Sequence, residues 1–326
     1  MRKAIKVGLS LLVFMAICGA AGYFYFWHSP LPRMPQLSAN AQRATLRVGD
    51  RDRTYLSYIP ANLPRGAPLV IVLHGSVMDG TMMREWTGYE FDQMADQFGF
   101  AVVYPDGYKH DWNVCWKNAT FPAKIENVDD MGFITALIDR FRASHGIDPG
   151  KVFAFGYSNG GHMAFRLAAE APDEVAAVAA VAANLPTPDS SSCPQTGRTA
   201  RIMLVDGTKD PINPYDGGKI TLFGFSNRGV VLSAPASAES LARRNSATGT
   251  PVEADLPRKD ANDPTAVDLK RWANGNTPIV ELYTVTGGGH VVPQPVFRFP
   301  RLLGRTTSEL DAPRAALLFF GITKEY

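Results

Sequence analysis

Hydrophobic residues in this chain gather into short continuous runs, and amphipathic stretches separate the runs. Runs of this kind, rich in Val, Ile, Leu, Ala and Phe, are typical of strands that are buried on both faces of a sheet. The expected strands are 69–73, 100–103, 152–155, 175–183, 201–205 and 279–285, with an edge hairpin over 45–59. The expected helices are 82–98, 129–143, 162–169 and 308–320. This alternation predicts an α/β protein with a mostly parallel central sheet and helices on both faces.

The segment after the strand at 152–155 predicts a nucleophile. Its sequence is Gly156-Tyr157-Ser158-Asn159-Gly160, and the residues that follow favour a helix. A G-x-S-x-G sequence between a strand and a helix is typical of the nucleophile elbow, in which a serine sits at a strained corner that leaves no room for side chains two residues away. The alternative is a glycine-rich turn without chemistry. The strand and helix on either side favour Ser158 as a nucleophile.

A serine nucleophile requires an acid and a base, in the chain order Ser, Asp, His that this type of elbow uses. Asp206 directly ends the strand at 201–205, whereas Asp210 lies deeper in the following loop. We expect Asp210 to be the acid; the alternative is that it only caps the turn before Pro211.

The base is expected at His290, which follows the strand at 279–285 and three glycines. The glycines would allow the imidazole a flexible approach to the elbow. His162 is expected to point away along the helix. In this arrangement His290 takes the proton of Ser158, and Asp210 fixes the imidazole tautomer.

Two backbone N–H groups are expected to stabilise the oxyanion. One is that of Asn159, directly after the nucleophile. The other comes from the loop His74-Gly75-Ser76, with the N–H of Ser76 favoured because Gly75 lets the backbone turn inward.

Five motifs resemble the polyhydroxybutyrate depolymerase-like, feruloyl-esterase-related α/β-hydrolases. They are Leu73-His-Gly-Ser76, Val128-Asp-Asp-Met-Gly-Phe133, Gly156-Tyr-Ser-Asn-Gly-Gly161, Gly207-Thr-Lys-Asp210 with Pro214-Tyr215, and Gly287-Gly-Gly-His290. The resemblance runs from about residue 45 to the C-terminus. It implies an exported serine esterase whose triad positions are matched by Ser158, Asp210 and His290.

The chain departs from this family at three positions. Ser76 stands where a cysteine commonly follows the His-Gly pair, Asp206 replaces a usual histidine, and Val292 replaces a tryptophan that often follows the catalytic histidine. The last two departures bear on substrate preference.

The N-terminus predicts export. Basic residues precede an uncharged apolar run over 7–27, which suits a membrane-spanning anchor. A cleaved signal peptide, with its core at 7–17 and its cut region at 18–22, is the alternative. The aromatic stretch Tyr23–Trp27 favours the anchor. We therefore expect a signal anchor or signal peptide over 1–28, a proline-rich linker over 29–44 and a catalytic domain over 45–326, in the periplasm or outside the cell.

Composition limits the kinds of molecule that this protein is expected to bind. The formal net charge is +2, and no basic stripe is present, so a nucleic-acid partner is not expected. No cysteine and histidine cluster has zinc-ligand spacing, and neither a metal nor a cofactor is expected. Cys115 and Cys193 either form a disulfide or remain as two buried thiols.

The substrate is expected to be a soluble ester: a hydroxybutyrate oligomer, a short-chain acyl ester, or a feruloyl or acetyl sugar ester. Trp112, Trp116 and Tyr157 could form an aromatic wall for a phenolic acyl group, or could pack in the core. No separate binding module is expected, and 246–270 is interpreted as a surface insertion. The alternatives are a serine peptidase of the same fold and a membrane-tethered binding module with an inactive site.

Overall fold

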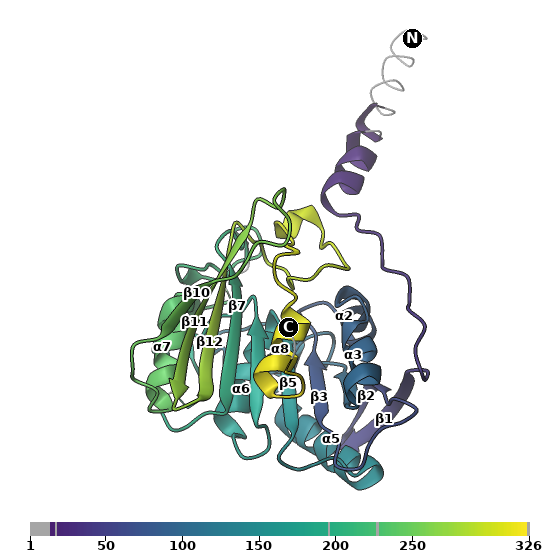
Figure 1. The fold of residues 1–326 in the computed structure, drawn as a ribbon. Coiled ribbons are helices and arrows are strands. Elements are labelled where there is room, and N and C mark those ends of the chain that lie inside the picture. Colours follow the sequence, from purple (N-terminus) through teal and green to yellow (C-terminus); the bar gives the residue numbers. More distant parts are fainter. Residues whose placement is uncertain (1–13, 17, 195, 226–227, 325–326) are drawn as a thin grey trace, which may run out of the picture.

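The computed structural model describes residues 14–16, 18–194, 196–225 and 228–324. These residues form one large sheet with the strand order β1-β2-β4-β3-β5-β6-β7-β12-β11-β10 (Figure 1). The central pairs from β4 to β12 are parallel and the outer pairs are antiparallel. The strands are β1 (Gln42–Val48), β2 (Arg51–Tyr58), β3 (Leu69–Leu73), β4 (Ala101–Pro105), β5 (Val152–Tyr157), β6 (Ala177–Val181), β7 (Arg201–Gly207), β10 (Val252–Asp255), β11 (Ala266–Asn274) and β12 (Thr277–Thr286).

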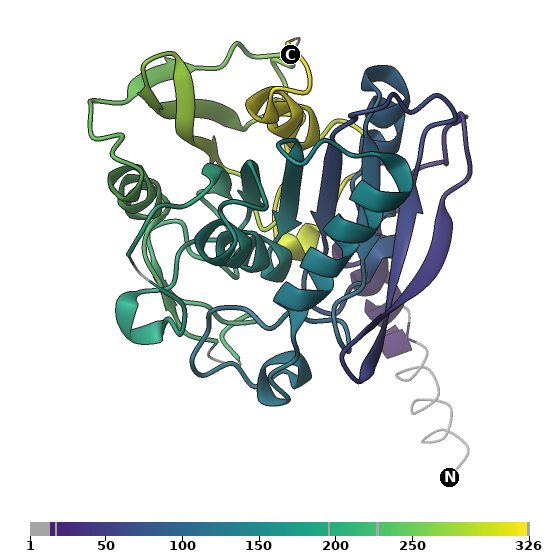
Figure 2. The same cartoon turned by 90° about the horizontal axis from the view of Figure 1, so that it is seen from below.

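Helices cover both faces of this sheet, as the sequence predicts (Figures 1 and 2). One hydrophobic core contains the inner faces of α5 (Asp130–His145), α6 (Asn159–Glu170) and α7 (Ala234–Arg244). A second core, across the sheet, contains those of α2 (Gly80–Trp86), α3 (Glu90–Phe98) and α8 (Ala312–Phe320). The shorter elements are α4 (Pro122–Ile125), η1 (Pro188–Ser190), β8 (Gly218–Lys219), β9 (Val230–Val231) and η2 (Arg301–Leu303). The α/β fold class is confirmed.

Two predicted segments differ from the structure. The expected helix over 82–98 is divided into α2 and α3, because Gly88 and Tyr89 both have positive φ, 64° and 58°. The expected surface insertion over 246–270 contains β10 and the start of β11, which extend the sheet by antiparallel pairing. Its polar composition reflects the exposure of an edge strand, since β10 is exposed along its whole length.

The predicted linker also differs, because its second half packs on the domain. The N–H and hydroxyl of Ser38 both donate to the carboxylate of Asp96, at 2.8 and 2.5 Å, and the Tyr58 hydroxyl donates to the same carboxylate. Leu37 packs against the second core, and β1 begins at Gln42. The folded domain therefore begins several residues before the predicted boundary at 45.

The predicted anchor over 7–27 falls partly outside the described residues. Its described part is helical over 14–16 and 18–26. Within the described ranges, no helix combines the length and hydropathy needed to cross a membrane.

Candidate active site

Ser158 occupies a sharp corner between β5 and α6. Its backbone angles are φ 54° and ψ −116°, a conformation that costs energy for a residue with a side chain. Packing requires the two glycines that lie two residues before and after Ser158. A Cβ at Gly156 would overlap the carbonyl oxygen of Gly160, and a Cβ at Gly160 would overlap the carbonyl oxygen of Leu73. The glycines of the motif thus permit a corner that projects Ser158 at the carboxyl edge of the sheet.

A continuous line of hydrogen bonds joins the three residues predicted as a triad. His290 Nε2 lies 2.9 Å from Ser158 Oγ, and His290 Nδ1 lies 2.7 Å from Asp210 Oδ2. The other oxygen of Asp210 accepts from the backbone N–H groups of Ile212 and Asn213, each at 2.8 Å. Because a carboxylate at Nδ1 requires a proton there, Nε2 is left to accept the proton of Ser158.

The loop that carries His290 is held closely rather than flexibly. The N–H of His290 donates to the carbonyl of Leu303 at 2.6 Å, and the carbonyl of His290 accepts from the Tyr157 hydroxyl at 2.9 Å. A Cβ at Gly289 would overlap the carbonyl oxygen of Leu303. Gly288 and Gly289 therefore serve close packing, and Gly287 adopts a positive φ of 79°, so the predicted flexible approach is corrected on this point.

The predicted oxyanion loop is oriented by a buried histidine. His74 Nε2 accepts from the N–H of Gly107 at 2.8 Å, so Nδ1 carries the proton and donates to the carbonyl of Gly75 at 2.7 Å. Burial lowers the pKa of His74 to about 4, which keeps it neutral. In a trans peptide the carbonyl of Gly75 and the N–H of Ser76 point in opposite directions, so this bond fixes the direction of the Ser76 N–H.

A narrow cavity opens beside Ser158. Its water-accessible volume is about 20 Å³, close to the space of a single water molecule. The residues that line it are Trp116, Phe121, Ser158, Asn159, His162, Ala182, Ile212, Asn213, Ile220, Arg228 and His290. Most of this wall is apolar, and Arg228 is its one side chain with a fixed positive charge.

Of the three aromatic residues predicted as an acyl wall, only Trp116 lines this cavity. Trp112 is fully buried, and its indole N–H donates to the carbonyl of His74 at 2.9 Å. Tyr157 is buried and bonds to the backbone of His290. The wall prediction is therefore corrected at Trp112 and Tyr157, because both contact the backbone of the site rather than the space beside Ser158.

His162 also departs from its predicted position. It lies one helical turn after Ser158, lines the cavity, and packs its ring against Trp116 with centroids 4.9 Å apart. Burial, followed by the nearby His290 and Arg228, lowers the pKa of His162 to about 3. A periodicity of 3.6 residues returns i+4 to the face of i, which is the signal that could have located it.

Sequence reasoning missed Arg228, Phe121 and Ile220. They lie in irregular segments, and no periodicity or motif connects them with the elbow.

Cys115 and Cys193 form a disulfide, 78 residues apart in sequence. It fastens the segment that carries Trp116, which also forms a β-bridge with Ser191. Both sulfurs lie near Glu170, and these three side chains are the one group of possible metal ligands within the described part of the chain. Since both sulfurs are used in the disulfide, this group does not fit a metal ion.

Asp206, the other carboxylate near the site, is in a different environment from Asp210. Both of its side-chain oxygens are buried without a hydrogen-bond partner among the described residues. Burial, and next the charge of Asp210, raise the pKa of Asp206 well above its ordinary value. The fold therefore favours the protonated, neutral form of Asp206.

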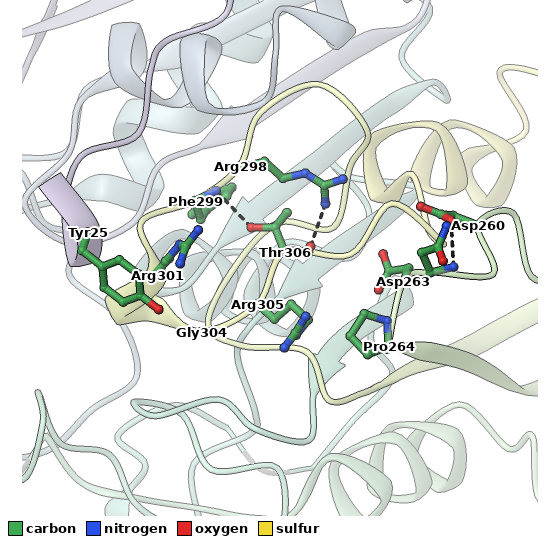
Figure 3. Close-up of a pocket in the computed structure, with 11 residues that line it drawn as sticks. Tyr25, Asp260, Asp263, Pro264, Arg298, Phe299, Arg301, Gly304, Arg305 and Thr306 are labelled. Carbon is green, nitrogen blue, oxygen red and sulfur yellow. Dashed lines mark hydrogen bonds between the residues drawn. The ribbon is translucent and has the colours of Figure 1, made fainter.

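A larger cavity, of about 660 Å³, lies away from Ser158 and is shown in Figure 3. Its wall includes Tyr25 from the N-terminal helix and the arginines 298, 301 and 305, with Arg301 over the Tyr25 ring at 4.5 Å. None of the predicted triad residues lines it. The wall of this cavity contacts the loop that carries His290. The carbonyl of Leu303 accepts from the N–H of His290, and the carbonyl of Arg305 accepts from the N–H of Gly289.

Comparison with known proteins agrees with this architecture. Residues 53–206 match the family described as "Esterase PHB depolymerase". A Nocardia uniformis subsp. tsuyamanensis protein named "Putative esterase NocK" is 30% identical over 302 residues, which cover 89% of this chain and 86% of that protein. Poly(3-hydroxyalkanoate) depolymerase C of Paucimonas lemoignei is 28% identical over 72% of this chain and 58% of its own length.

Among solved structures, an acetyl xylan esterase from Aspergillus awamori has the same fold. The match covers 87% of this chain and 100% of the esterase, with a TM-score of 0.57 and 16% sequence identity. Fold and sequence together define a carboxylic ester hydrolase of the α/β-hydrolase class. The chain belongs to the PHB depolymerase family of esterases.

Proposed function

We propose that this protein is an exported serine esterase that cleaves small carboxylic esters through an acyl-enzyme on Ser158. The observation that carries the proposal is the hydrogen-bonded line from Ser158 through His290 to Asp210. An imidazole that accepts from a serine hydroxyl and donates to a fixed carboxylate is the arrangement that activates the hydroxyl for attack.

In this mechanism Ser158 Oγ attacks the ester carbonyl carbon while His290 Nε2 takes its proton. The negative charge that develops on the carbonyl oxygen is stabilised by the N–H groups of Asn159 and Ser76. His290 then returns the proton to the leaving alcohol. A water molecule, deprotonated by the same nitrogen, releases the acid from Ser158.

The narrow cavity supports a short acyl group. With about 20 Å³ of water-accessible space between Trp116, Phe121 and Ile220, the cavity wall must move less for an acetyl or hydroxybutyryl group than for a feruloyl ring, so small acyl groups are favoured. We therefore rank acetyl, short-chain acyl and hydroxybutyrate esters above feruloyl esters as substrates.

Export is proposed from the sequence, since the uncharged apolar run over 7–27 follows a basic N-terminus. Fractionation of cells that express the full chain would test it. Recovery with the cytoplasmic enzymes would contradict export.

The test of the esterase activity is hydrolysis by the full chain, purified in detergent, of p-nitrophenyl acetate, p-nitrophenyl butyrate, methyl ferulate and a 3-hydroxybutyrate trimer. The matched variants are Ser158→Ala and Ser144→Ala, the second on the exposed face of α5. We expect Ser158→Ala to lower kcat by roughly ten-thousand-fold or more and Ser144→Ala to leave it unchanged. Equal activity of wild type and Ser158→Ala would exclude the proposed nucleophile, and an inactive but folded wild type would exclude the esterase.

A further inference from the structure

Arg228 places a positive charge at the solvent side of the cavity beside Ser158. Arg228 and Ser158 are both only partly buried, whereas Trp116 and Phe121 in the same wall are buried. One nitrogen of the guanidinium, Nη1, donates to Ser76 Oγ at 2.7 Å. The remaining N–H donors of a guanidinium form a planar fork that matches a carboxylate.

The backbone at Arg228 is firmly positioned. Its N–H donates to the carbonyl of Ile220, and the N–H of Ile220 donates to the carbonyl of Gly229, both at 3.0 Å. A Cβ at Gly229 would overlap the ring of Trp116, so the chain passes directly over the indole at this point. The backbone of Arg228 is therefore held against the cavity wall, and its side chain lines the cavity.

No carboxylate of the described residues lies in direct contact with the guanidinium of Arg228. Among the described residues Arg228 forms no ion pair, and its contacts are the Ser76 hydroxyl and the ring of Phe121, 5.9 Å from the guanidinium carbon. The carboxylate that senses its charge is Asp111, which is buried, and burial raises the pKa of that carboxyl. Since a guanidinium stays protonated and is costly to leave unpaired beside apolar groups, the site is suited to an anion supplied from outside.

We propose that Arg228 binds a carboxylate on the substrate, so that the preferred esters carry an anionic group a few bonds from the carbonyl that Ser158 attacks. This inference rests on the proposed esterase function and narrows its substrate class. A linear oligomer of a hydroxy acid has this chemistry, because its last unit bears a free carboxylate next to the terminal ester bond. Arg228 would then direct cleavage toward that end of the oligomer.

Matched ester pairs test the inference, and they differ only in charge. For a carboxylate on the acyl part, ethyl hydrogen succinate is compared with ethyl succinamate, its carboxamide. For a carboxylate on the alcohol part, the 3-hydroxybutyrate dimer is compared with its terminal carboxamide. We expect wild type to favour the anionic member of at least one pair by about 10- to 100-fold in kcat/KM, mainly through a lower KM.

Two variants of the full chain complete the test. Arg228→Gln should lower kcat/KM for the anionic ester more than for its neutral partner, so that the preference is lost, and Arg228→Lys should restore part of the preference because the charge remains. A role limited to holding the oxyanion loop through Ser76 would instead lower kcat equally for both members of a pair.

An equal loss of kcat for both members of a pair in Arg228→Gln would overturn the inference. A wild type that shows no preference in either pair would also overturn it. Neither result would contradict the proposed esterase activity. Inactivity of the folded wild type on all four esters would overturn both proposals. The comparison of the paired esters in wild type requires no substitution. It therefore tests the inference even if Arg228→Gln does not fold.

Discussion

Ser158, Asp210 and His290 each follow a strand of the central sheet, whereas much of the cavity wall, including Trp116, Phe121, Ile220 and Arg228, comes from irregular stretches between the regular elements. In a parallel sheet the carboxyl ends of the strands meet at one edge, so residues that follow β5, β7 and β12 must lie near one another. The position of the cavity wall depends instead on individual long-range contacts. Examples are the Cys115–Cys193 disulfide and the close approach of Gly229 to Trp116.

This contrast has a consequence for function. The proposed chemistry depends on hydrogen bonds between residues that the sheet itself brings together. The proposed selectivity depends on Trp116, Ile220 and Arg228, which could move with their loops while the triad stays intact. Changes in the first region should therefore abolish turnover, and changes in the second should alter the choice of ester.

The largest expected effect is in the triad region. Asp210→Asn replaces the carboxylate at His290 Nδ1 with an amide, which can donate to Nδ1 and favour the wrong tautomer. We expect kcat on p-nitrophenyl acetate to fall by roughly a thousand- to ten-thousand-fold with KM little changed. Steady-state kinetics at pH 7 to 8 measures this.

Asp206→Asn is the matched control, because Asp206 lies four residues before Asp210 and its burial favours the neutral form of the acid. Its turnover should stay within about threefold of wild type, since no hydrogen bond connects it to His290 in the described chain. If Asp206→Asn were the slower of the two variants, the assignment of the acid would be reversed.

The next largest effect, about tenfold, is expected in the cavity wall. Trp116→Phe enlarges the space beside Ser158, so the ratio of kcat/KM for p-nitrophenyl hexanoate to that for the acetate should rise by about tenfold. Trp112→Phe removes an indole bond to the carbonyl of His74 outside the cavity. It should lower both rates together and leave the ratio unchanged.

The ratio measured for a series of acyl lengths checks both variants. An unchanged ratio in Trp116→Phe, or an equal rise in Trp112→Phe, would show that the acyl group occupies another space.

The same contrast explains how much could be predicted from the sequence. Continuous apolar runs locate the parallel strands, and motifs at their ends select the three residues that the structure joins by hydrogen bonds. Aromatic residues near the site could not be divided into wall and core, since Trp112 and Trp116 are four residues apart and equally apolar. Their roles differ only because one indole finds the carbonyl of His74 and the other contacts His162.

The polar composition of 246–270 was also ambiguous, because it fits both a loop and an exposed edge strand. The stretch 246–270 was expected as a loop, but the exposed edge strand β10 requires no apolar face, so its pattern lacks the alternation of a half-buried strand. Arg228 could not be predicted for the same reason, since its role depends on a backbone pairing with Ile220 rather than on its neighbours in sequence.

The smallest expected effect concerns stability at the boundary between the two regions. Burial raises the pKa of Asp206 above its unfolded value, so the fold favours the protonated acid. This contribution is fully present below the unfolded pKa, near 4, and is lost as the pH rises toward the folded pKa. Asp206→Asn cannot ionise. The variant should therefore match wild type near pH 3 and, above pH 4, exceed it in free energy of unfolding by about 1.4 kcal/mol for each pH unit up to the folded pKa of Asp206. Urea unfolding of both proteins from pH 3 to pH 8 measures the difference. A variant that is less stable than wild type at pH 7 would mean that Asp206 is charged and bound in the folded protein, and the neutral control for Asp210 would then have to be chosen elsewhere.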